Sequence, residues 1–148
     1  LIHENFSLPQ LDEHIDMSGN PMSIGRYFSE MLDPSMNWND VQEMVKIWNG
    51  QFCLKGIISV EDAKKAVDIG CTGIILSNHG GRQLDGSRSP FDQLSDIVDA
   101  VGDKIDVIMD SGVQRGTHVL KALSLGAKAV GGGTFLFISS CSSWPAWS

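Results

Sequence analysis

The apolar residues of this chain change their spacing near residue 50. Upstream of that point they recur three and four positions apart, which is the spacing of a helix with one buried face. Two helices are therefore predicted within residues 1–50, after a polar loop over residues 1–20. Asn37 is predicted to cap the second helix and Gly50 to end it. The predicted buried stripes are Ile24, Tyr27, Phe28 and Met31 in the first helix and Val41, Met44, Val45 and Trp48 in the second.

From residue 51 onward a different unit repeats: a short apolar run, a polar turn, a capped amphipathic helix and a terminating glycine. The apolar runs predict strands at residues 52–55, 73–77, 105–109 and 128–132. Ser59 with Asp62 and Ser89 with Asp92 predict the caps of the first two helices. The predicted buried stripes are Ala63, Ala66 and Val67, then Phe91, Leu94, Ile97, Val98 and Val101, then Val119, Leu120 and Leu123.

Four βα units in succession without hairpin turns predict an α/β protein with a parallel sheet. The first strand is not followed by G-x-G-x-x-G and the later loops are glycine-rich, which favours a (β/α)₈ TIM barrel over a dinucleotide-binding sheet. A whole barrel needs about 250 residues, so residues 51–137 are expected to be units 5 to 8, the C-terminal half. The chain starts at Leu1 without Met, and we expect a fragment. Residues 138–148 lack periodicity and are expected to be a non-native tail, with a genuine flexible tail as the alternative.

Composition and charge narrow the classes of partner. The formal net charge is −7 and no basic run occurs, which argues against nucleic acid. The apolar runs fall short of the roughly 18 residues of a membrane span, and the first ten residues do not form a signal peptide. Cys53, Cys71 and Cys141 lack C-x-x-C spacing. Neither a disulfide framework nor a metal site is therefore expected, and reduced thiols in the cytoplasm fit this pattern.

In a barrel, active sites lie at the C-terminal ends of the strands, so polar residues directly after each apolar run are the candidates. Lys55, the segment Ser77–Arg82 and Asp110 all occupy such places. A histidine such as His79 accepts a proton near neutral pH, and Arg82 can hold a carboxylate through two hydrogen bonds beside it. The alternative is a glycine turn with solvent-facing charges.

The loops after the last two predicted strands favour an anion site. Residues 110–116 lead into a predicted helix N-terminus, where unpaired N–H groups attract phosphate. This part of a barrel often holds a phosphate group, and flavin mononucleotide (FMN) would fit it. The alternative is that the glycines serve only as ordinary turns.

Two stretches carry a resemblance to a known family: LKGIISVEDAKKAVDIGCTGIILSNHGGRQLDG at residues 54–86 and DSGVQRGTHVLKALSLGAKAVGGG at residues 110–133. They strongly resemble the FMN-dependent α-hydroxy-acid dehydrogenases, and the string SNHGGRQLD is highly specific. The resemblance covers roughly residues 20–137. The segment DPSMNWND and its distance from LKG look most like the bacterial quinone-linked L-lactate dehydrogenases.

The resemblance implies roles for individual residues. His79 would take the substrate hydroxyl proton, Arg82 would hold the substrate carboxylate, and Lys55 would lie at the N1 and C2 carbonyl edge of the flavin. Where the family has phosphate-binding arginines, this chain has Gln114 and Thr134, and Arg115 could compensate for the first. The full set implied to bind FMN is Lys55, Ser77, Asp110, Ser111, Gly112, Val113, Gln114, Gly133 and Thr134.

The implied function is oxidation of an L-2-hydroxy acid, foremost L-lactate to pyruvate, with electrons passing to FMN and then to a quinone or another acceptor. The parent protein is expected to be a homo-oligomer in the cytoplasm, or at the inner face of the cell membrane. One alternative is an oxidase that passes electrons to O₂, such as glycolate or lactate oxidase. The other is an inactive half-barrel, because the carboxylate that pairs with the histidine in the family comes from the fourth strand.

Overall fold

A computed structural model describes residues 29–83 and 86–132. The chain divides into two compact units, residues 1–37 and residues 38–148. In the first unit residues 29–31 are helical, and the rest of the first predicted helix lies outside the described residues. The elements of the second unit are α2 (Trp38–Trp48), β1 (Cys53–Ile57), α3 (Val60–Asp68), β2 (Gly73–Leu76), the 3₁₀ turn η1 (His79–Gly81), α4 (Pro90–Val101), β3 (Asp106–Met109), α5 (Gly116–Ser124) and β4 (Ala129–Val130).

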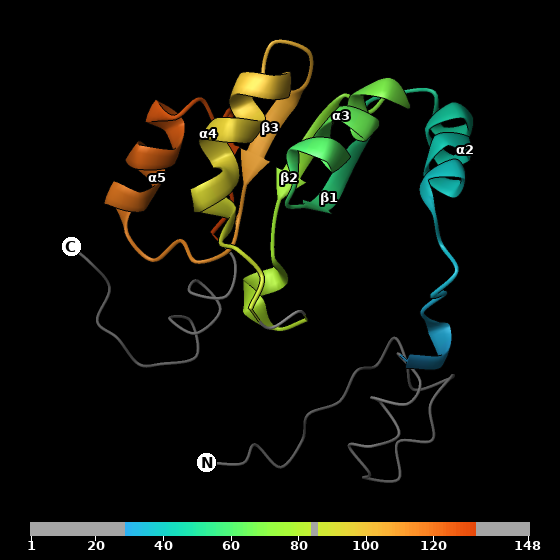
Figure 1. The fold of residues 1–148 in the computed structure, drawn as a ribbon, viewed down its shortest axis with the longest axis horizontal. Coiled ribbons are helices and arrows are strands. Elements are labelled where there is room, and N and C mark those ends of the chain that lie inside the picture. The colour runs from blue at the N-terminus through green and yellow to red at the C-terminus, as the bar shows by residue number, and fades with distance from the viewer. Residues whose placement is uncertain (1–28, 84–85, 133–148) are drawn as a thin grey trace, which may run out of the picture. The chain divides into compact units, whose positions relative to one another are not determined.

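The four strands form one parallel sheet in the order β1-β2-β3-β4, so each strand pairs with the next one in the sequence. The helices α3, α4 and α5 all lie on one side of this sheet (Figure 1). A doubly wound sheet would instead reverse its strand order and carry helices on both faces. The predicted half-barrel is therefore confirmed, although β4 is shorter than the predicted strand at residues 128–132.

Local capping rules explain where the helices begin. Ser59 Oγ accepts a hydrogen bond from the backbone N–H of Asp62 at 3.1 Å, and Ser89 Oγ accepts one from Asp92 at 3.2 Å. Both caps match the prediction, and each satisfies an N–H group that has no partner within its helix. A cation–π contact connects α2 to α3, because the Lys65 ammonium of α3 lies 5.5 Å from the centre of the Trp38 ring of α2.

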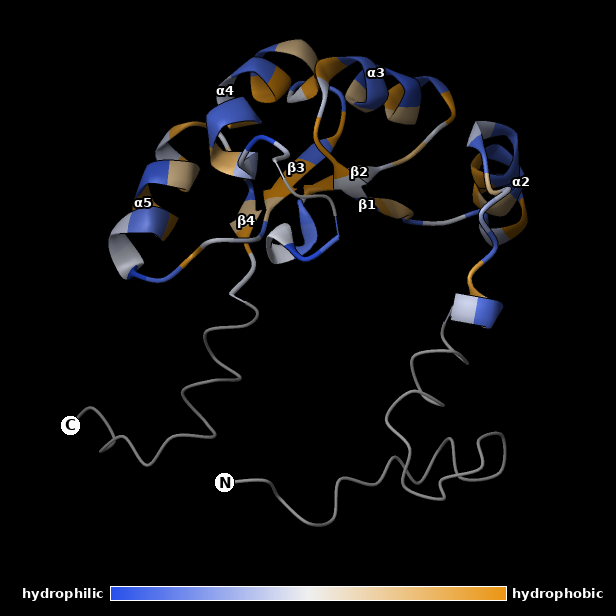
Figure 2. Cartoon of the chain, turned by 60° about the horizontal axis from the view of Figure 1, so that its bottom comes forward, coloured by the Kyte–Doolittle hydropathy of each residue, from blue (hydrophilic) through white to orange (hydrophobic). Residues whose placement is uncertain are grey.

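The core lies between the sheet and the helices, where the hydrophobic side chains of the strands meet the inner faces of α3 and α4 (Figure 2). Its fully buried members are Ala63, Ala66, Ile74, Leu76, Leu94, Ile97, Val101 and Ala122. Sealing these side chains from water is the main force that holds the helices on the sheet.

Several residues of the predicted buried stripes are exposed in the structure. Trp48 is 66% exposed and Leu120 is 68% exposed. Helical periodicity predicts which face is apolar, but burial also requires a neighbouring element, and α5 buries only Ala122 against the described part of the chain. The predicted burial is wrong for Met31, Met44, Trp48, Phe91, Leu120 and Leu123.

Within the described residues no helix has both the length and the apolar character needed to cross a membrane. The same residues contain no group of three or more His, Cys, Asp or Glu side chains that could hold a metal ion. Cys53 and Cys71 are free thiols, the first exposed and the second buried, and burial raises the pKa of both. Cys141 lies outside the described residues.

Candidate active site

Polar side chains from three neighbouring strands meet at the C-terminal edge of the sheet. Lys55 of β1 stands in register with Ile75 of β2, which stands in register with Ile108 of β3. Side chains two residues apart on a strand point to the same face. Ser77 and Asp110, two residues beyond those isoleucines, therefore lie above the same face as Lys55. Parallel pairing is what brings these three side chains to one place.

The three side chains are in direct contact. Lys55 Nζ lies 3.2 Å from Asp110 Oδ2 and donates a hydrogen bond to Ser77 Oγ at 2.9 Å. Ser111 Oγ donates to Asp110 Oδ1 at 2.8 Å and lies 3.3 Å from Ser77 Oγ. We call Lys55, Ser77, Asp110 and Ser111 the polar cluster. Ser77 is buried, whereas the Lys55 side chain is 48% exposed.

The surroundings of Asp110 favour its ionised form. Partial burial acts to raise the pKa of Asp110, but hydrogen bonds from Ser77, Ser111 and Lys55, together with the Lys55 charge, lower it by more. The net result is a pKa below the usual range of an aspartate. At neutral pH the cluster therefore holds one carboxylate against one ammonium group.

His79 begins η1 directly above the polar cluster. His79, Gly80 and Gly81 all adopt positive φ, at 57°, 70° and 71°. Two glycines tolerate this conformation, whereas the histidine adopts it at a cost. Hydrogen bonds to the cluster hold the turn, because the N–H of His79 donates to Ser77 Oγ at 3.2 Å and the N–H of Gly80 donates to Ser111 Oγ at 3.1 Å.

The side chains of His79 and Arg82 lie side by side at the surface. Arg82 Nη2 is 3.4 Å from His79 Nε2, and Arg82 Nε donates to the His79 carbonyl oxygen at 3.3 Å. Both residues are exposed. An imidazole and a guanidinium group thus share one open edge, and these two groups together could accept a proton and bind a carboxylate.

The predicted anion loop follows Asp110. Ser111 and Gly112 adopt positive φ of 73° and 71°, and a Cβ built on Gly112 meets no atom within 4 Å. His118, which the sequence analysis missed, accepts a hydrogen bond at Nδ1 from the N–H of Gln114 at 3.3 Å. His118 is the third residue of α5, a position from which a side chain can accept a hydrogen bond from an N–H before the helix, as in a capping box. That position in the sequence could have identified His118 as part of the loop's support.

The predicted site residues thus fall into four groups. Lys55, Ser77, Asp110 and Ser111 touch one another, and His79 with Arg82 stands beside them. Gly112, Val113 and Gln114 continue along the β3–α5 loop. Gly133 and Thr134, which were predicted to complete the phosphate site, lie outside the described residues.

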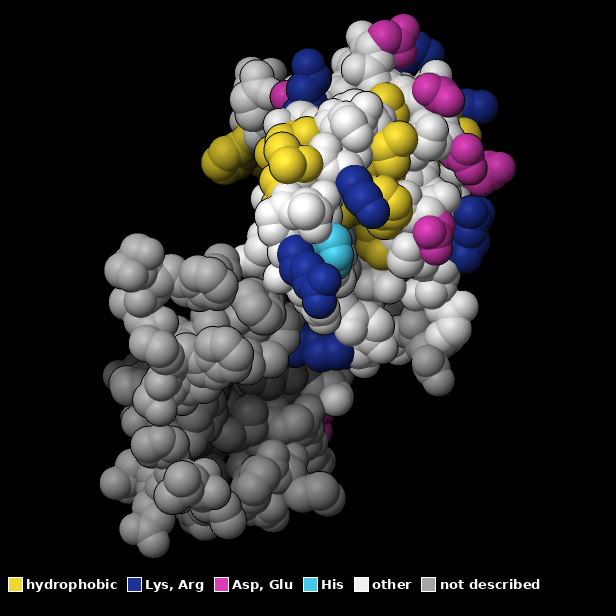
Figure 3. All heavy atoms as spheres, turned by 90° about the vertical axis from the view of Figure 1, so that its left-hand side faces the viewer, with side chains coloured by type: hydrophobic (Ala, Val, Ile, Leu, Met, Phe, Trp, Pro, Cys, Tyr) yellow, Lys and Arg dark blue, Asp and Glu magenta, His cyan; other side chains and the backbone are white. Residues whose placement is uncertain are grey.

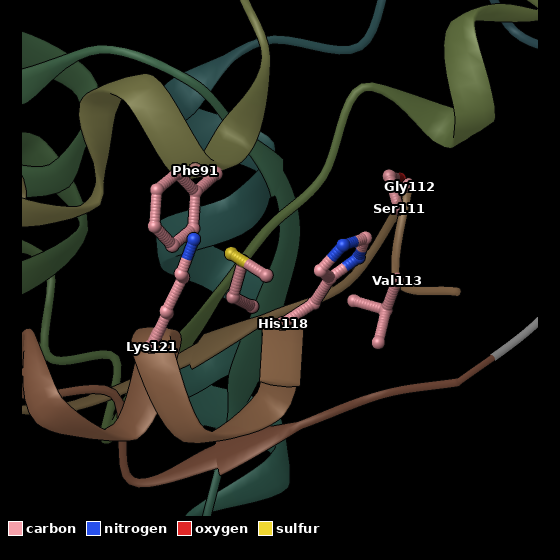
Figure 4. Close-up of a pocket in the computed structure, with 7 residues that line it drawn as sticks. Phe91, Ser111, Gly112, Val113, His118 and Lys121 are labelled. Atoms are coloured by element: carbon pink, nitrogen blue, oxygen red, sulfur yellow. The ribbon is translucent and has the colours of Figure 1, made fainter. Parts of the chain in front are cut away.

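A cavity of about 300 Å³ opens between α4 and α5 (Figure 4). Its wall includes Met109, which is buried in the core on the helix side of β3, whereas the next residue, Asp110, faces the polar cluster. The face seen in Figure 3 places hydrophobic side chains next to a histidine and several basic residues. His79 does not line this cavity, but the cavity reaches the polar cluster at Ser111. It is lined by Phe91, Met109, Ser111, Gly112, Val113, His118 and Lys121.

Comparison with known proteins places this geometry in context. The model of the family described as FMN-dependent dehydrogenase matches residues 3–140. The FMN-dependent alpha-hydroxy acid dehydrogenase qulF of Penicillium citrinum is 52% identical over 104 residues, which cover 70% of this chain and 26% of that protein. The L-lactate dehydrogenase (cytochrome) of Saccharomyces cerevisiae is 47% identical over 122 residues, covering 78% of this chain and 21% of that protein. The chain thus spans about a quarter of the length of these two relatives.

Solved structures agree. A crystal structure of mandelate oxidase superposes with a TM-score of 0.69 at 41% identity, covering 75% of this chain and 32% of that one. Related structures of that enzyme carry FMN adducts. The similarity thus extends from sequence to fold and includes a flavin-binding enzyme.

Proposed function

This chain belongs to the family of FMN-dependent dehydrogenases, and from that premise we propose that the protein oxidises an L-2-hydroxy acid, foremost L-lactate, to the corresponding 2-oxo acid. The contact of 3.4 Å between Arg82 Nη2 and His79 Nε2 carries this proposal. It places a base and a carboxylate-binding group side by side, where one small substrate could reach both. The polar cluster next to them supplies a cation for an electron-rich cofactor.

His79 and Arg82 have different roles toward the substrate. The Arg82 guanidinium holds the carboxylate through paired hydrogen bonds and so fixes which way the hydroxyl group points. His79 Nε2 accepts the hydroxyl proton as the C–O bond gains double-bond character. Bound FMN would supply the acceptor for the hydrogen on Cα and for two electrons. Loss of that hydrogen and of the hydroxyl proton converts L-lactate into pyruvate.

The residues at this edge fit the ring end of FMN. The half-exposed Lys55 ammonium can stabilise negative charge at the N1 and C2 carbonyl edge of the ring. Ser77 and Asp110 offer hydrogen-bonding groups to the ribityl chain. Gly81 and Gly112 carry no side chain, and a Cβ built on either meets no atom within 4 Å. A flat ring can therefore approach the backbone there.

This chain offers few charged side chains where the phosphate of FMN would bind. Gln114 stands where the family has an arginine, and its N–H is already bonded to His118. Arg115, the residue before α5, makes no side-chain cap to that helix and is the cation left to meet the phosphate from this loop. We infer that this chain holds FMN mainly through its ring and ribityl contacts.

The electron acceptor and the cellular setting are also part of the proposal. We favour a quinone or another electron acceptor, on the resemblance of the segment at residues 33–40 to the quinone-linked branch. We also propose a homo-oligomer in the cytoplasm or at the inner membrane face, and the free thiols of Cys53 and Cys71 fit the reducing compartment that this location implies. An oxidase remains the second candidate, supported by 45% identity to the human 2-hydroxyacid oxidase 1.

Anaerobic addition of L-lactate to the FMN-loaded full-length protein tests the proposal. The flavin absorbance should bleach with L-lactate and stay unchanged with D-lactate. Admitting O₂ then separates the two candidates, because an oxidase recovers its absorbance within its turnover time whereas a dehydrogenase recovers it slowly until a quinone is added. An FMN-loaded protein whose absorbance no 2-hydroxy acid bleaches would refute the proposal.

A further inference from the structure

The polar cluster forms a closed ring of contacts. Lys55 contacts Ser77, Ser77 contacts Ser111, Ser111 contacts Asp110, and Asp110 returns to Lys55. Two backbone N–H groups of the His79 turn also bond to this ring, one to each serine hydroxyl. The ring thus connects three strand ends to the turn that carries His79.

The direction of the hydrogen bonds in the ring follows from the chemistry of its members. An ammonium group only donates, a carboxylate only accepts, and a hydroxyl donates one proton and accepts at two lone pairs. Ser77 Oγ accepts from Lys55 and from the N–H of His79. Its own proton must therefore be donated toward Asp110, either to Ser111 Oγ or to the carboxylate itself.

The proton and both lone pairs of the Ser111 hydroxyl are engaged as well. Its proton goes to Asp110 Oδ1 at 2.8 Å, and its lone pairs face the N–H of Gly80 at 3.1 Å and Ser77 Oγ at 3.3 Å. The hydroxyl can accept from Gly80 in this way because the ionised carboxylate fixes where its proton points. Protonating Asp110 leaves a carbonyl oxygen as an acceptor, but it weakens the hydrogen bond from Ser111 and removes the charge that holds Lys55.

The backbone of Ser111 gives a second, independent observation. Its φ of 73° lies in the left-handed region, where a glycine would sit without strain and a serine does so at a cost. A serine in this conformation needs an interaction of its side chain that offsets the backbone strain. Here the hydroxyl makes three contacts that a glycine could not make.

We propose that Ser111 is a positioning residue that holds the His79 turn in place through the N–H of Gly80, and that it does so most firmly while Asp110 is ionised. The inference rests on the proposed function only in treating this turn as the one that acts on substrate. The hydrogen bonds themselves exist without FMN or substrate. Loss of the ring would displace the His79 turn relative to the polar cluster without unfolding the sheet.

Residue-resolved amide hydrogen exchange on the 148-residue chain, without FMN, tests the proposal. Ser111→Gly removes the hydroxyl and suits the positive φ, and Ser111→Ala removes the hydroxyl alone. In both variants the Gly80 amide should exchange about two- to tenfold faster, the range that one net hydrogen bond gives. The Asp62 amide, which bonds to Ser59 Oγ outside the ring, is the internal reference. Asn49→Gly is the control, since Asn49 also has a positive φ, of 49°, outside the ring.

The dependence on pH separates positioning from a merely structural role. After correction for intrinsic exchange, protection of Gly80 in the unmodified chain should fall as pH drops through the Asp110 titration, and in Ser111→Ala it should not change there. Unchanged Gly80 exchange in both Ser111 variants would overturn the proposal, as would a pH-independent protection in the unmodified chain. The pH dependence of Gly80 protection in the unmodified chain can be measured even if a variant fails to fold. Neither result depends on whether lactate bleaches a bound flavin.

Discussion

The loops after β2 and β3 end at the same edge of the sheet but differ in what holds them. The β2 loop carries His79 and Arg82, and the serine hydroxyls of the polar cluster bind two of its backbone N–H groups. The β3 loop has a neutral Gln114, whose N–H is held by His118 of its own helix. The His79 turn is thus held in part by Ser111 of the neighbouring loop, whereas Gln114 is held by its own helix. The comparison supports the proposed substrate site better than the proposed phosphate site.

The largest expected effect comes from the β2 loop. In the FMN-loaded full-length protein, His79→Gln should lower kcat for L-lactate by about 10² to 10⁴, the usual contribution of a general base. FMN should remain bound, because the base acts on substrate. Stopped-flow bleaching of the flavin measures the step. His118→Gln is the matched control, and it should bleach normally per bound FMN; turnover of the His79 variant at the rate of the unmodified protein would remove His79 from the mechanism.

The second effect also belongs to the β2 loop. Arg82→Met keeps the length of the side chain and removes its charge, so it should lose charge-assisted hydrogen bonds that contribute about 1.5 to 3 kcal/mol. That loss corresponds to a roughly 10- to 150-fold lower kcat/KM for L-lactate. Steady-state kinetics would detect it, and Arg88→Met, on an exposed residue before α4, supplies the control. Normal kcat and KM in Arg82→Met would assign the carboxylate to another group.

A gain is expected at the β3 loop. Gln114→Arg restores the charge that the family has at this position, and it should tighten FMN binding by roughly tenfold or more through one charge-assisted hydrogen bond. Fluorescence titration of FMN against both proteins measures the ratio of the dissociation constants. Gln114→Lys tests whether charge alone suffices. Equal affinity in all three proteins would place the phosphate elsewhere than this loop.

The smallest effect concerns pH and the polar cluster. The pKa of Asp110 is lower in the folded chain than in an unfolded one, so its contribution to stability is complete above the ordinary aspartate pKa of about 3.9 and is lost as pH falls through the folded value. Chemical unfolding of the unmodified chain and of Asp110→Asn should therefore give stabilities that converge in acid. A difference that stays constant down to the lowest pH at which the chain folds would contradict this sign.

Much of the fold could be predicted because its signals are local. Ser59 and Ser89 cap helices through atoms three residues away, and Gly70 and Gly126 end α3 and α5 through their positive φ. The strands were placed to within a few residues by their apolar runs. Exposure of Trp48 and Leu120 could not be predicted, since burial depends on which element packs against a helix.

The sequence by itself determined the order of the βα units, the helix caps, the residue types at the strand ends, and the family to which His79 and Arg82 point. Only the tertiary structure decided which of those residues touch. Lys55, Ser77 and Asp110 are separated by 22 and 33 positions, and they meet because parallel pairing aligns their strands in register. The bond from Gly80 to Ser111 likewise spans 31 positions, and no local pattern can encode a contact between loops whose distance the sheet sets.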